Sequence, residues 1–222
     1  MHKHGPLQLA VFVEPMFQEN ALLLWTADGP AAWLIDPGLP PHAEQMRAAL
    51  RARQLTAAAI LLTHCHADHI AGAGELCASL DGVQLYAPRD EEHMLSDPEA
   101  NLSAPFGFNV TTPPANRLLA PGETLTLGAL TWQVLDVAGH SPGGLAFYCA
   151  AAGVVITGDA LFAGSIGRYD FPGSSGARLL ANIRQHLLTL PPETVVYAGH
   201  GPATTIGDEL ETNPFLDEDF RA

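Results

Sequence analysis

Three histidines and an aspartate occur within seven residues, directly after an apolar run that is typical of a buried strand. The run covers residues 57–62, and the cluster that follows is Thr63-His64-Cys65-His66-Ala67-Asp68-His69. Imidazole and carboxylate groups are the ligands that zinc, iron and manganese accept, and packing alone does not concentrate them on so few residues. The sequence therefore predicts a sheet strand that ends in a metal site.

The order of these residues suggests how they share metal ions. If the chain stays extended, His64 and His66 point to one side and Cys65 to the other, because side chains alternate along a strand. Asp68 and His69 precede a segment of helical character, so a turn directs them away from the first pair, toward a second ion. Each has an ordinary alternative, since aspartate often caps a helix and histidine often lies at a surface. The four together favour a metal site.

Composition limits the class of protein. A chain of 222 residues, 47% of them apolar, can bury a large core, and residues 1–222 are interpreted as one domain. The 24 acidic residues outnumber the 10 lysines and arginines, which argues against a nucleic-acid partner. Three cysteines without C-x-x-C spacing are typical of a reducing compartment. With neither a signal peptide nor a membrane-spanning run, we expect a cytoplasmic protein without a membrane partner.

Apolar periodicity predicts two β-rich halves that each end in helices. In the first half we expect strands, a helix at 41–53, a second helix from 69 to about 80 and a short one near 89–95. In the second half we expect two hairpins, a helix at 174–190 and a buried strand. The expected strands cover residues 7–13, 21–26, 31–35, 57–62 and 83–86, then 124–127, 129–137, 144–150, 154–157 and 194–197. Two sheets between helical layers follow from this α/β pattern.

Residues 97–114 show neither the helical nor the strand period and are rich in Pro, Asn and Thr. Long loops of this kind are disproportionately functional, so we expect a surface excursion over the site, with disorder as the alternative.

Three more polar residues follow strands of the second half. His140, Asp159 and His200 come after the strands that end near residues 137, 157 and 197, and glycine precedes each of them. Glycine permits close approach of the backbone, and polar side chains at strand ends can assemble a site at a sheet edge. Each residue alone is equally compatible with a turn.

The four motifs in order resemble those of the metallo-β-lactamase fold superfamily. They are T-H-C-H-A-D-H at 63–69, G-H-S-P-G-G at 139–144, G-D-A-L-F at 158–162 and G-H-G-P at 199–202. The resemblance covers essentially the whole chain and implies a four-layer αββα sandwich of two mixed β-sheets flanked by helices. Within the superfamily, residues 158–172 and 199–216 look like the short glyoxalase II-like hydrolases of the YcbL type.

The resemblance also implies a ligand set for two divalent metal ions. His64, His66 and His140 would hold one ion, Asp68, His69 and His200 the other, and Asp159 would bridge them. Zinc is the first choice, and iron or manganese also suit these ligands. The implied reaction is thioester hydrolysis by a metal-bound hydroxide, which Asp68 would orient as the catalytic carboxylate.

Several other residues have a possible functional role beside a purely structural one. Asp36 would support a ligand histidine from behind, or simply form its turn. Arg168 and Tyr169 would contact substrate, or form a salt bridge and cover a sheet edge. Phe106 and Phe108 would line an acyl pocket, with core packing as the favoured alternative. Cys65 is expected to be a buried apolar residue. No ligand role is expected for the remaining histidines, because none has a partner at ligand spacing; they are His2, His4, His42, His93 and His186.

The chain departs from full-length glyoxalase II enzymes at its end. Those enzymes have a helical extension that supplies cations to the glutathione carboxylates, whereas this sequence ends soon after residue 216 with the acidic tail Asp217-Glu218-Asp219. Glutathione specificity is therefore doubtful. The acyl group, thiol carrier and oligomeric state stay open.

Two other functions stay open. The 63–70 segment is also very like that of the persulfide dioxygenases of the same superfamily, where one iron is held by residues matching His64, His140 and Asp159. The G-H-G-P motif favours the hydrolases. A metal-binding module without catalytic activity is the third hypothesis.

Overall fold

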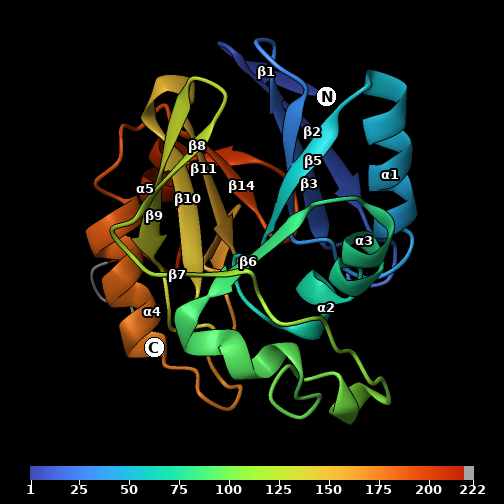
Figure 1. The fold of residues 1–222 in the computed structure, drawn as a ribbon. Helices are drawn as coiled ribbons and strands as arrows, with labels where there is room; N and C mark the ends of the chain where they lie inside the picture. Colours follow the sequence, from blue (N-terminus) through green and yellow to red (C-terminus); the bar gives the residue numbers. More distant parts are fainter. Residues whose placement is uncertain (218–222) are drawn as a thin grey trace.

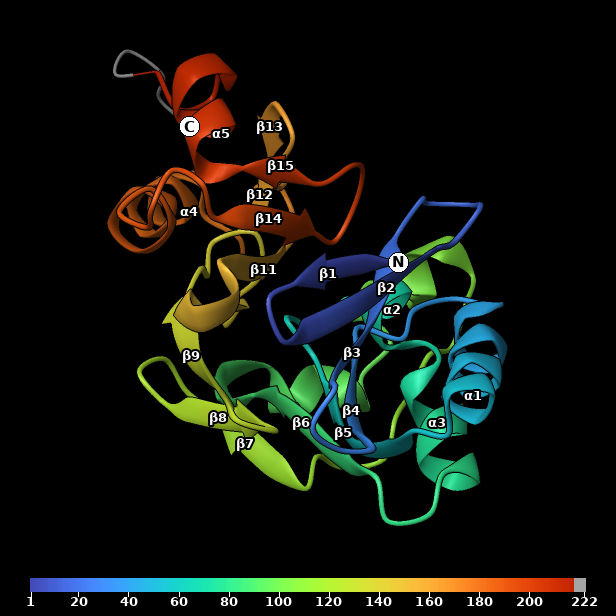
Figure 2. The ribbon, with the colours of Figure 1, turned by 90° about the horizontal axis from the view of Figure 1, so that it is seen from above.

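Two mixed sheets pack face to face, and helices cover both outer faces (Figure 1). The computed structural model describes residues 1–217, so Glu218 and Asp219 of the acidic tail lie outside the described residues. This is the four-layer sandwich expected from the sequence, and Figure 2 shows the two sheets from above. Within residues 1–217, no helix has the length and apolar character needed to cross a membrane.

The first sheet contains seven strands in sequence order, as described for residues 1–217. Neighbours from β1 to β4 are antiparallel, and neighbours from β4 to β7 are parallel. The strands are β1 (His2–His4), β2 (Leu7–Val13), β3 (Asn20–Thr26), β4 (Ala31–Ile35), β5 (Thr56–Leu61), β6 (Gln84–Pro88) and β7 (Arg117–Leu119).

The second sheet has the order β15-β14-β11-β10-β9-β8. Only the pair β11 and β14 is parallel among its described neighbours. The strands are β8 (Thr124–Leu127), β9 (Leu130–Asp136), β10 (Leu145–Cys149), β11 (Val154–Gly158), β14 (Val195–Ala198) and β15 (Thr204–Thr205). A small hairpin of β12 (Leu161–Phe162) and β13 (Ser165–Ile166) follows β11.

Most of the helices connect one strand to the next along the chain. The first half contains α1 (His42–Arg53), α2 (Ala67–Ile70), α3 (Ala73–Ser79) and the 3₁₀ helices η1 (Arg89–Leu95) and η2 (Ala104–Phe106). The second half contains η3 (Ala150–Ala152), α4 (Gly176–Asn182), the π-helical turn η4 (Ile183–Leu187) and α5 (Ile206–Thr212).

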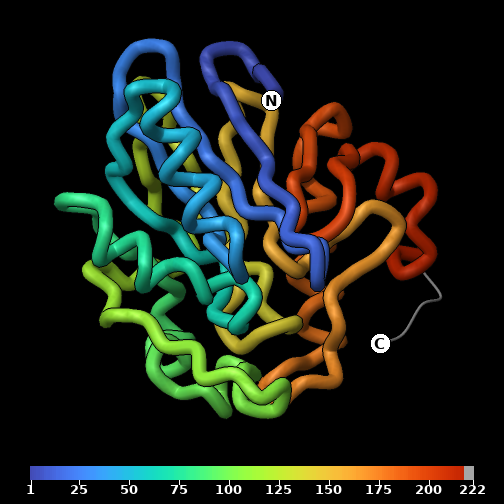
Figure 3. Tube along the Cα trace, turned by 90° about the vertical axis from the view of Figure 1, so that its right-hand side faces the viewer, coloured from blue at the N-terminus to red at the C-terminus, as the bar shows by residue number. Residues whose placement is uncertain are grey.

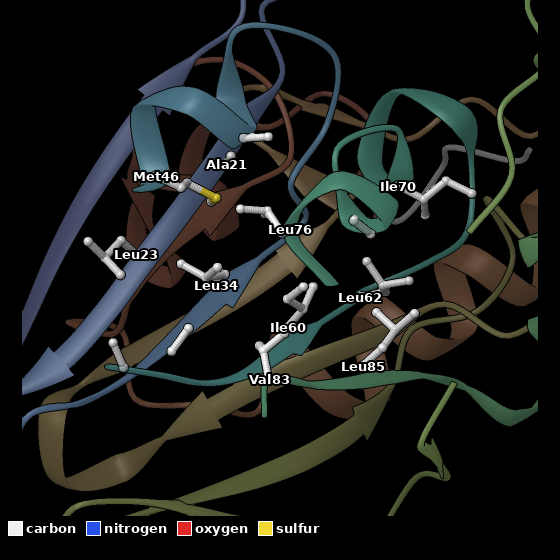
Figure 4. Close-up of a cluster of buried hydrophobic side chains, with 14 of the residues drawn as sticks. Ala21, Leu23, Leu34, Met46, Ile60, Leu62, Ile70, Leu76, Val83 and Leu85 are labelled. Atoms are coloured by element: carbon white, nitrogen blue, oxygen red, sulfur yellow. The ribbon is translucent and has the colours of Figure 1, made fainter. Parts of the chain in front are cut away.

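Three apolar clusters lie between the four layers. The alternation in β3 divides its side chains, because Leu23 packs with Met46 of α1 and Leu76 of α3, as Figure 4 shows. Leu22 and Leu24 instead face the second sheet, where Trp132 and Phe147 are fully buried. The third cluster joins the second sheet to α4 and η4. With both faces of each sheet covered, the polar groups of the strand ends are left to build the site.

The structure corrects two expected helices. The expected helix from residue 69 to about 80 is divided into α2 and α3, which are joined at residues 71 and 72. Gly72 lies here against the carbonyl oxygens of Pro37 and Gly38, and a side chain would displace that contact. The expected helix at 174–190 changes from α to π geometry at residue 183.

Residues 97–114 form turns and the 3₁₀ helix η2, and they lie beneath the ends of both sheets, in green at the bottom of Figures 1 and 3. Buried Asn101 organises this segment, because its amide donates hydrogen bonds to the carbonyl oxygens of Met94 (2.9 Å) and Val110 (2.9 Å). The N-terminal histidines also differ from expectation, since they form β1 and His4 Nε2 lies 2.8 Å from the Tyr197 hydroxyl.

Candidate metal centre

The two sheets are joined at the end where the polar strand-end residues lie. The Leu145 amide donates to the Thr63 carbonyl (2.8 Å), and the Asn20 amide donates to the Gly199 carbonyl (2.7 Å). These bonds bring the segment after β5 beside the loop before β10, and the segment after β14 beside the start of β3. Six of the seven candidate ligands come from these segments, and the seventh, Asp159, follows β11, where the Gly199 amide donates to the Gly158 carbonyl (2.8 Å).

The first group of donors is His64, His66 and His140, all buried. One nitrogen of each lies within 4.8 Å of the others, and His66 Nδ1 is 2.9 Å from His140 Nε2. Cys65 points the other way, into the core that faces α1 and α3. The expected alternation along an extended segment is therefore observed at these residues.

The second group is Asp68, His69 and His200, with donor atoms again within 4.8 Å of one another. The Asp68 Oδ2 atom is 3.9 Å from His69 Nε2 and 3.5 Å from His200 Nε2. His66 is extended, and the turn into α2 begins at Ala67, which carries Asp68 and His69 away from the first group.

Asp159 lies between the two groups. Its Oδ1 atom is 3.4 Å from His69 Nε2, and its Oδ2 atom is 3.5 Å from both His140 Nε2 and His200 Nε2. One carboxylate thus faces imidazoles of both groups. A carboxylate in this position could serve ions held by both groups.

Four of the five histidines use Nδ1 for a contact with the protein and leave Nε2 for the centre of the cluster. His64 Nδ1 contacts the Thr63 hydroxyl (3.1 Å), and His69 Nδ1 contacts Asp36 Oδ2 (3.1 Å). His140 Nδ1 and His200 Nδ1 donate to the carbonyl oxygens of Arg168 (2.8 Å) and Phe17 (3.0 Å) respectively. Such outer contacts fix the tautomer and orientation of metal-binding imidazoles.

Asp36 supports the cluster from behind. Its carboxylate accepts hydrogen bonds from the amide and hydroxyl of Thr63 at 2.7 and 2.6 Å, besides its contact with His69. Its oxygens also lie within 4.8 Å of ligand atoms of His64 and His69. Because the carboxylate already contacts the Thr63 amide, the Thr63 hydroxyl and the His69 imidazole, its geometry suits an orienting role.

The polar atoms at the centre fit divalent cations. Within residues 1–217, His64 Nε2, His69 Nε2 and Asp159 Oδ1 are buried without a hydrogen-bond partner. Leaving such atoms unpaired costs about 1–3 kcal/mol each in a protein interior, so a native cluster needs something to occupy them. Imidazole nitrogens and carboxylate oxygens are suitable ligands for zinc, iron and manganese.

The protonation states point in the same direction. Burial lowers the pKa of His66 to about 3, and burial also lowers the pKa of His64 and His140. Burial alone would raise the pKa of Asp159, but His69 and its neighbours hold it well below the ordinary value. Burial likewise opposes the charge of His69, yet Asp159 and Asp68 raise its pKa. The first group is thus neutral imidazole, and the carboxylates draw positive charge to the centre.

Two glycines allow the backbone to approach the cluster. A Cβ atom at Gly199 would overlap Asp159 Oδ1 and His69 Cε1. A Cβ at Gly158 would overlap the Thr63 hydroxyl, and the positive φ of Gly158 (49°) also favours glycine. The expectation that the flanking glycines permit close approach is confirmed at both residues.

The cluster opens into a cavity of about 410 Å³. His66, Asp68, His140, Asp159 and His200 form its floor, and residues of the 97–114 segment form one wall. That segment therefore does pass over the site. Phe106 and Phe108 are 60% and 44% exposed and line this cavity, so the expected core packing of these residues is wrong.

The two proposed substrate contacts differ in position. Arg168 lines the cavity, and its guanidinium is bonded to Asp170. Tyr169 is not among the described residues that line the cavity, and instead packs against the cluster between the second sheet and α4. This placement agrees with the alternative that Tyr169 covers part of the sheet.

Glu91 was not singled out from the sequence. Its fully buried carboxylate accepts hydrogen bonds from the amides of Cys65 (2.6 Å) and Gly143 (2.7 Å), and so connects both ligand loops of the first group. It belongs to the acidic run Asp90-Glu91-Glu92, which is typical of a solvent-exposed surface. No local signal distinguishes it from its neighbours.

The contact of His42 with Glu19 was not predicted from the sequence. Its Nδ1 atom lies 2.9 Å from Glu19 Oε2, and both side chains are fully buried. The other Glu19 oxygen lies 3.8 Å from His69 Nδ1, so the pair lies directly behind the second group. Glu19 and His42 are 23 positions apart in the chain, so local sequence gives no sign of the contact.

Comparison with known proteins agrees with this geometry. The sequence profile of the metallo-beta-lactamase superfamily matches residues 15–200. The probable metallo-hydrolase YqgX of Bacillus subtilis (strain 168) is 38% identical over 200 residues, which are 90% of this chain and 92% of the relative. The hydroxyacylglutathione hydrolase GloC of Haemophilus influenzae (strain Rd) is 36% identical over 202 residues, 90% of this chain and 93% of the relative.

Solved structures show the same fold. The BLEG-1 B3 metallo-beta-lactamase superposes with a TM-score of 0.89 at 40% identity, covering 94% of this chain and 99% of that protein. The di-iron-bound form of TTHA1623 superposes with a TM-score of 0.81 at 40% identity, covering 93% and 100%. The profile, the relatives and the fold agree, and the chain therefore belongs to the metallo-beta-lactamase superfamily.

Proposed function

We propose that this metallo-hydrolase cleaves thioesters and uses two divalent ions, zinc being the first candidate. One observation carries the proposal: two groups of three donors face a shared carboxylate, Asp159, on the floor of a cavity. His64, His66 and His140 would hold one ion and Asp68, His69 and His200 the other. The name of the GloC relative supports the thioester assignment.

When bound, two such ions would act as Lewis acids and lower the pKa of a coordinated water to about 7. The chain itself provides the orientation. His69, His140 and His200 are held by Asp36 and by two backbone carbonyls, so their ε nitrogens keep one direction during a reaction. A preorganised site needs no reorientation when charge develops.

Asp68 is suited to hold the attacking water. Its side chain lines the cavity and is 26% exposed. Burial alone would raise its pKa, but His69 and His200 lower it below the ordinary value. It is therefore an ionised acceptor at neutral pH and can take a hydrogen bond from water at the floor. A thiol leaving group with a pKa of about 8.5 departs as thiolate without a separate general acid.

Metal content and turnover test the proposal together. We expect two ions per chain by elemental analysis, and hydrolysis of a thioester panel by the same preparation. His66→Ala should lose both, whereas His93→Ala, at an exposed position in η1, should lose neither. Turnover that survives His66→Ala would contradict the assigned role.

Metal content and a wider substrate panel also distinguish the hydrolase from the dioxygenase and from a non-catalytic binding module. One iron per chain with oxygen uptake on a persulfide would favour the dioxygenase. Firm metal binding without turnover of any substrate would favour the binding module. A β-lactam belongs in the panel because of the structural likeness to the B3 metallo-beta-lactamase.

A further inference from the structure

The wall of the cavity above the proposed metal centre is mostly apolar, and its polar residues above the floor are Asn101, Ser103, Ser165 and Arg168. Five phenylalanines line it: Phe17, Phe106, Phe108, Phe162 and Phe171. Two ligands lie beside one of these rings, since the Phe171 ring is 5.5 Å from His66 and 5.8 Å from His140, measured between ring centroids. Such a wall favours apolar groups, because burial removes apolar surface from water.

Positively charged side chains are scarce in this cavity. Among the lining residues of the described chain, Arg168 is the one permanent cation. Its Nε and Nη2 atoms donate to the two carboxylate oxygens of Asp170 at 2.9 and 2.8 Å, and its guanidinium lies 4.4 Å from the Phe171 ring centroid. The guanidinium is thus paired with a carboxylate and lies against an aromatic ring. The net charge of −14 further opposes anionic substrates.

Two aromatic residues from distant segments meet at the mouth. Phe17 and Phe106 form an edge-on contact with ring centroids 6.2 Å apart, and they are 39% and 60% exposed. Exposed phenylalanines gain apolar contact when a ligand covers them. The Phe17 carbonyl also orients His200, so this end of the mouth is fixed relative to the floor.

On the basis of the proposed hydrolase function, we propose that the cavity selects thioesters with an apolar acyl group of aromatic size and a thiol portion without carboxylate or phosphate. Glutathione has two terminal carboxylates, and above the floor they would meet an apolar wall whose one permanent cation among the described residues, Arg168, is already paired with Asp170. Burying an unpaired carboxylate is costly, and the penalty falls on binding. A neutral thiol carrier avoids it.

Two non-hydrolysable thioethers test the inference by binding alone. S-benzyl-N-acetylcysteamine and S-benzylglutathione share the benzyl group and differ in the charge of the thiol portion. Calorimetry on the metal-loaded protein should show the neutral ligand bound at least about tenfold more tightly, which corresponds to about 1.4 kcal/mol. The same order should hold after metal removal, since a carboxylate can also coordinate an ion. Equal or tighter binding of S-benzylglutathione would overturn the inference.

Variants at exposed positions assign the selectivity to named groups. Phe106→Ala should weaken binding of the neutral ligand about tenfold. Leu210→Ala is the matched control, because Leu210 is 49% exposed on α5 and does not line the cavity. Asp170→Asn should reduce the difference in binding affinity between the two ligands, because it frees the Arg168 guanidinium to pair with a carboxylate of S-benzylglutathione. The inference would be contradicted if Asp170→Asn left the affinity difference between the two ligands unchanged and Phe106→Ala left the affinity for the neutral ligand unchanged.

Turnover separates this inference from the proposed function. Phenylacetyl thioesters of N-acetylcysteamine and of glutathione have the same acyl group and similar alkyl thiol leaving groups. Preference for the glutathione thioester would overturn the selectivity and leave the hydrolase function intact. Failure to hydrolyse either thioester, with two ions bound and the neutral thioether still preferred, would instead contradict the hydrolase function.

Discussion

The Glu91 carboxylate accepts a hydrogen bond from the Cys65 amide at 2.6 Å, and Cys65 lies between two candidate ligands. Its other oxygen accepts from Gly143, which follows His140. Because Glu91 is fully buried, Glu91→Gln places an amide NH₂ against a backbone donor. We expect metal affinity to fall about 10- to 100-fold, as for other outer residues of metal sites. Competition with a chromogenic chelator measures this.

Glu92→Gln is the matched control, since Glu92 is exposed in the same helix. Urea unfolding of the metal-free proteins should show that Glu91→Gln also costs about 2–3 kcal/mol, because a buried network is broken. A Glu91→Gln protein with wild-type metal affinity would show that the two backbone bonds do not position the ligands.

The Glu19–His42 pair leads to a second prediction. Burial raises the pKa of Glu19 and lowers that of His42 to about 4, so both groups are costly to leave alone in the interior. His42→Ala removes the neighbour that lies 2.9 Å from the carboxyl group. We expect a loss of about 3 kcal/mol in the free energy of unfolding, measured in urea.

Exposed His93→Ala should change the same free energy by less than about 0.5 kcal/mol. If His42→Ala were as stable as His93→Ala, the buried pair would be energetically unimportant. Because Glu19 also lies 3.8 Å from His69, we expect His42→Ala to lower metal affinity as well, by less than Glu91→Gln does.

The sequence predicted most strands because periodicity and turn residues are local. The bounds of β2 and β4 agree with expectation, and Gly128 and Gly153 each lie between the two strands of a predicted hairpin. The prediction of one continuous helix from residue 69 was wrong, because the helix breaks where Gly72 contacts the backbone of Pro37 and Gly38. Short strands such as β7 and β15 have too few residues to show a period.

The candidate ligands were predictable because their chemistry is unusual for strand ends. Their outer partners were predictable only in part. Asp36 belongs to a conspicuous turn, whereas Glu91 and Glu19 depend on contacts across the fold. The orienting carbonyls of Phe17 and Arg168 carry no side-chain signal at all. Backbone groups of this kind become visible only in three dimensions.

Gly199 provides a steric test of the centre. In Gly199→Ala the new methyl group overlaps Asp159 Oδ1 and His69 Cε1, so the shared carboxylate must move. We expect elemental analysis to show less than two ions per chain, and thioester turnover to fall at least about 100-fold, because displacements of about 1 Å are costly in catalysis. Gly29→Ala is the control, since a methyl group there would meet no described atom within 4 Å. Full metal loading of Gly199→Ala would contradict the close approach.

Removal of metal should destabilise the fold, because buried His64 Nε2 is then left without a hydrogen-bond partner, and the carboxylates of Asp68 and Asp159 lose the cations between them. Ions at about 100 times their dissociation constant stabilise a protein by about 2.7 kcal/mol. For a domain of this size that corresponds to a change of about 5–10 °C in Tm. Scanning calorimetry with and without a chelator measures the shift. In His66→Ala the shift should be much smaller, because the first group has lost a donor. A chelator effect of equal size in wild type and His66→Ala would mean that the stabilising ion is bound somewhere other than this cluster.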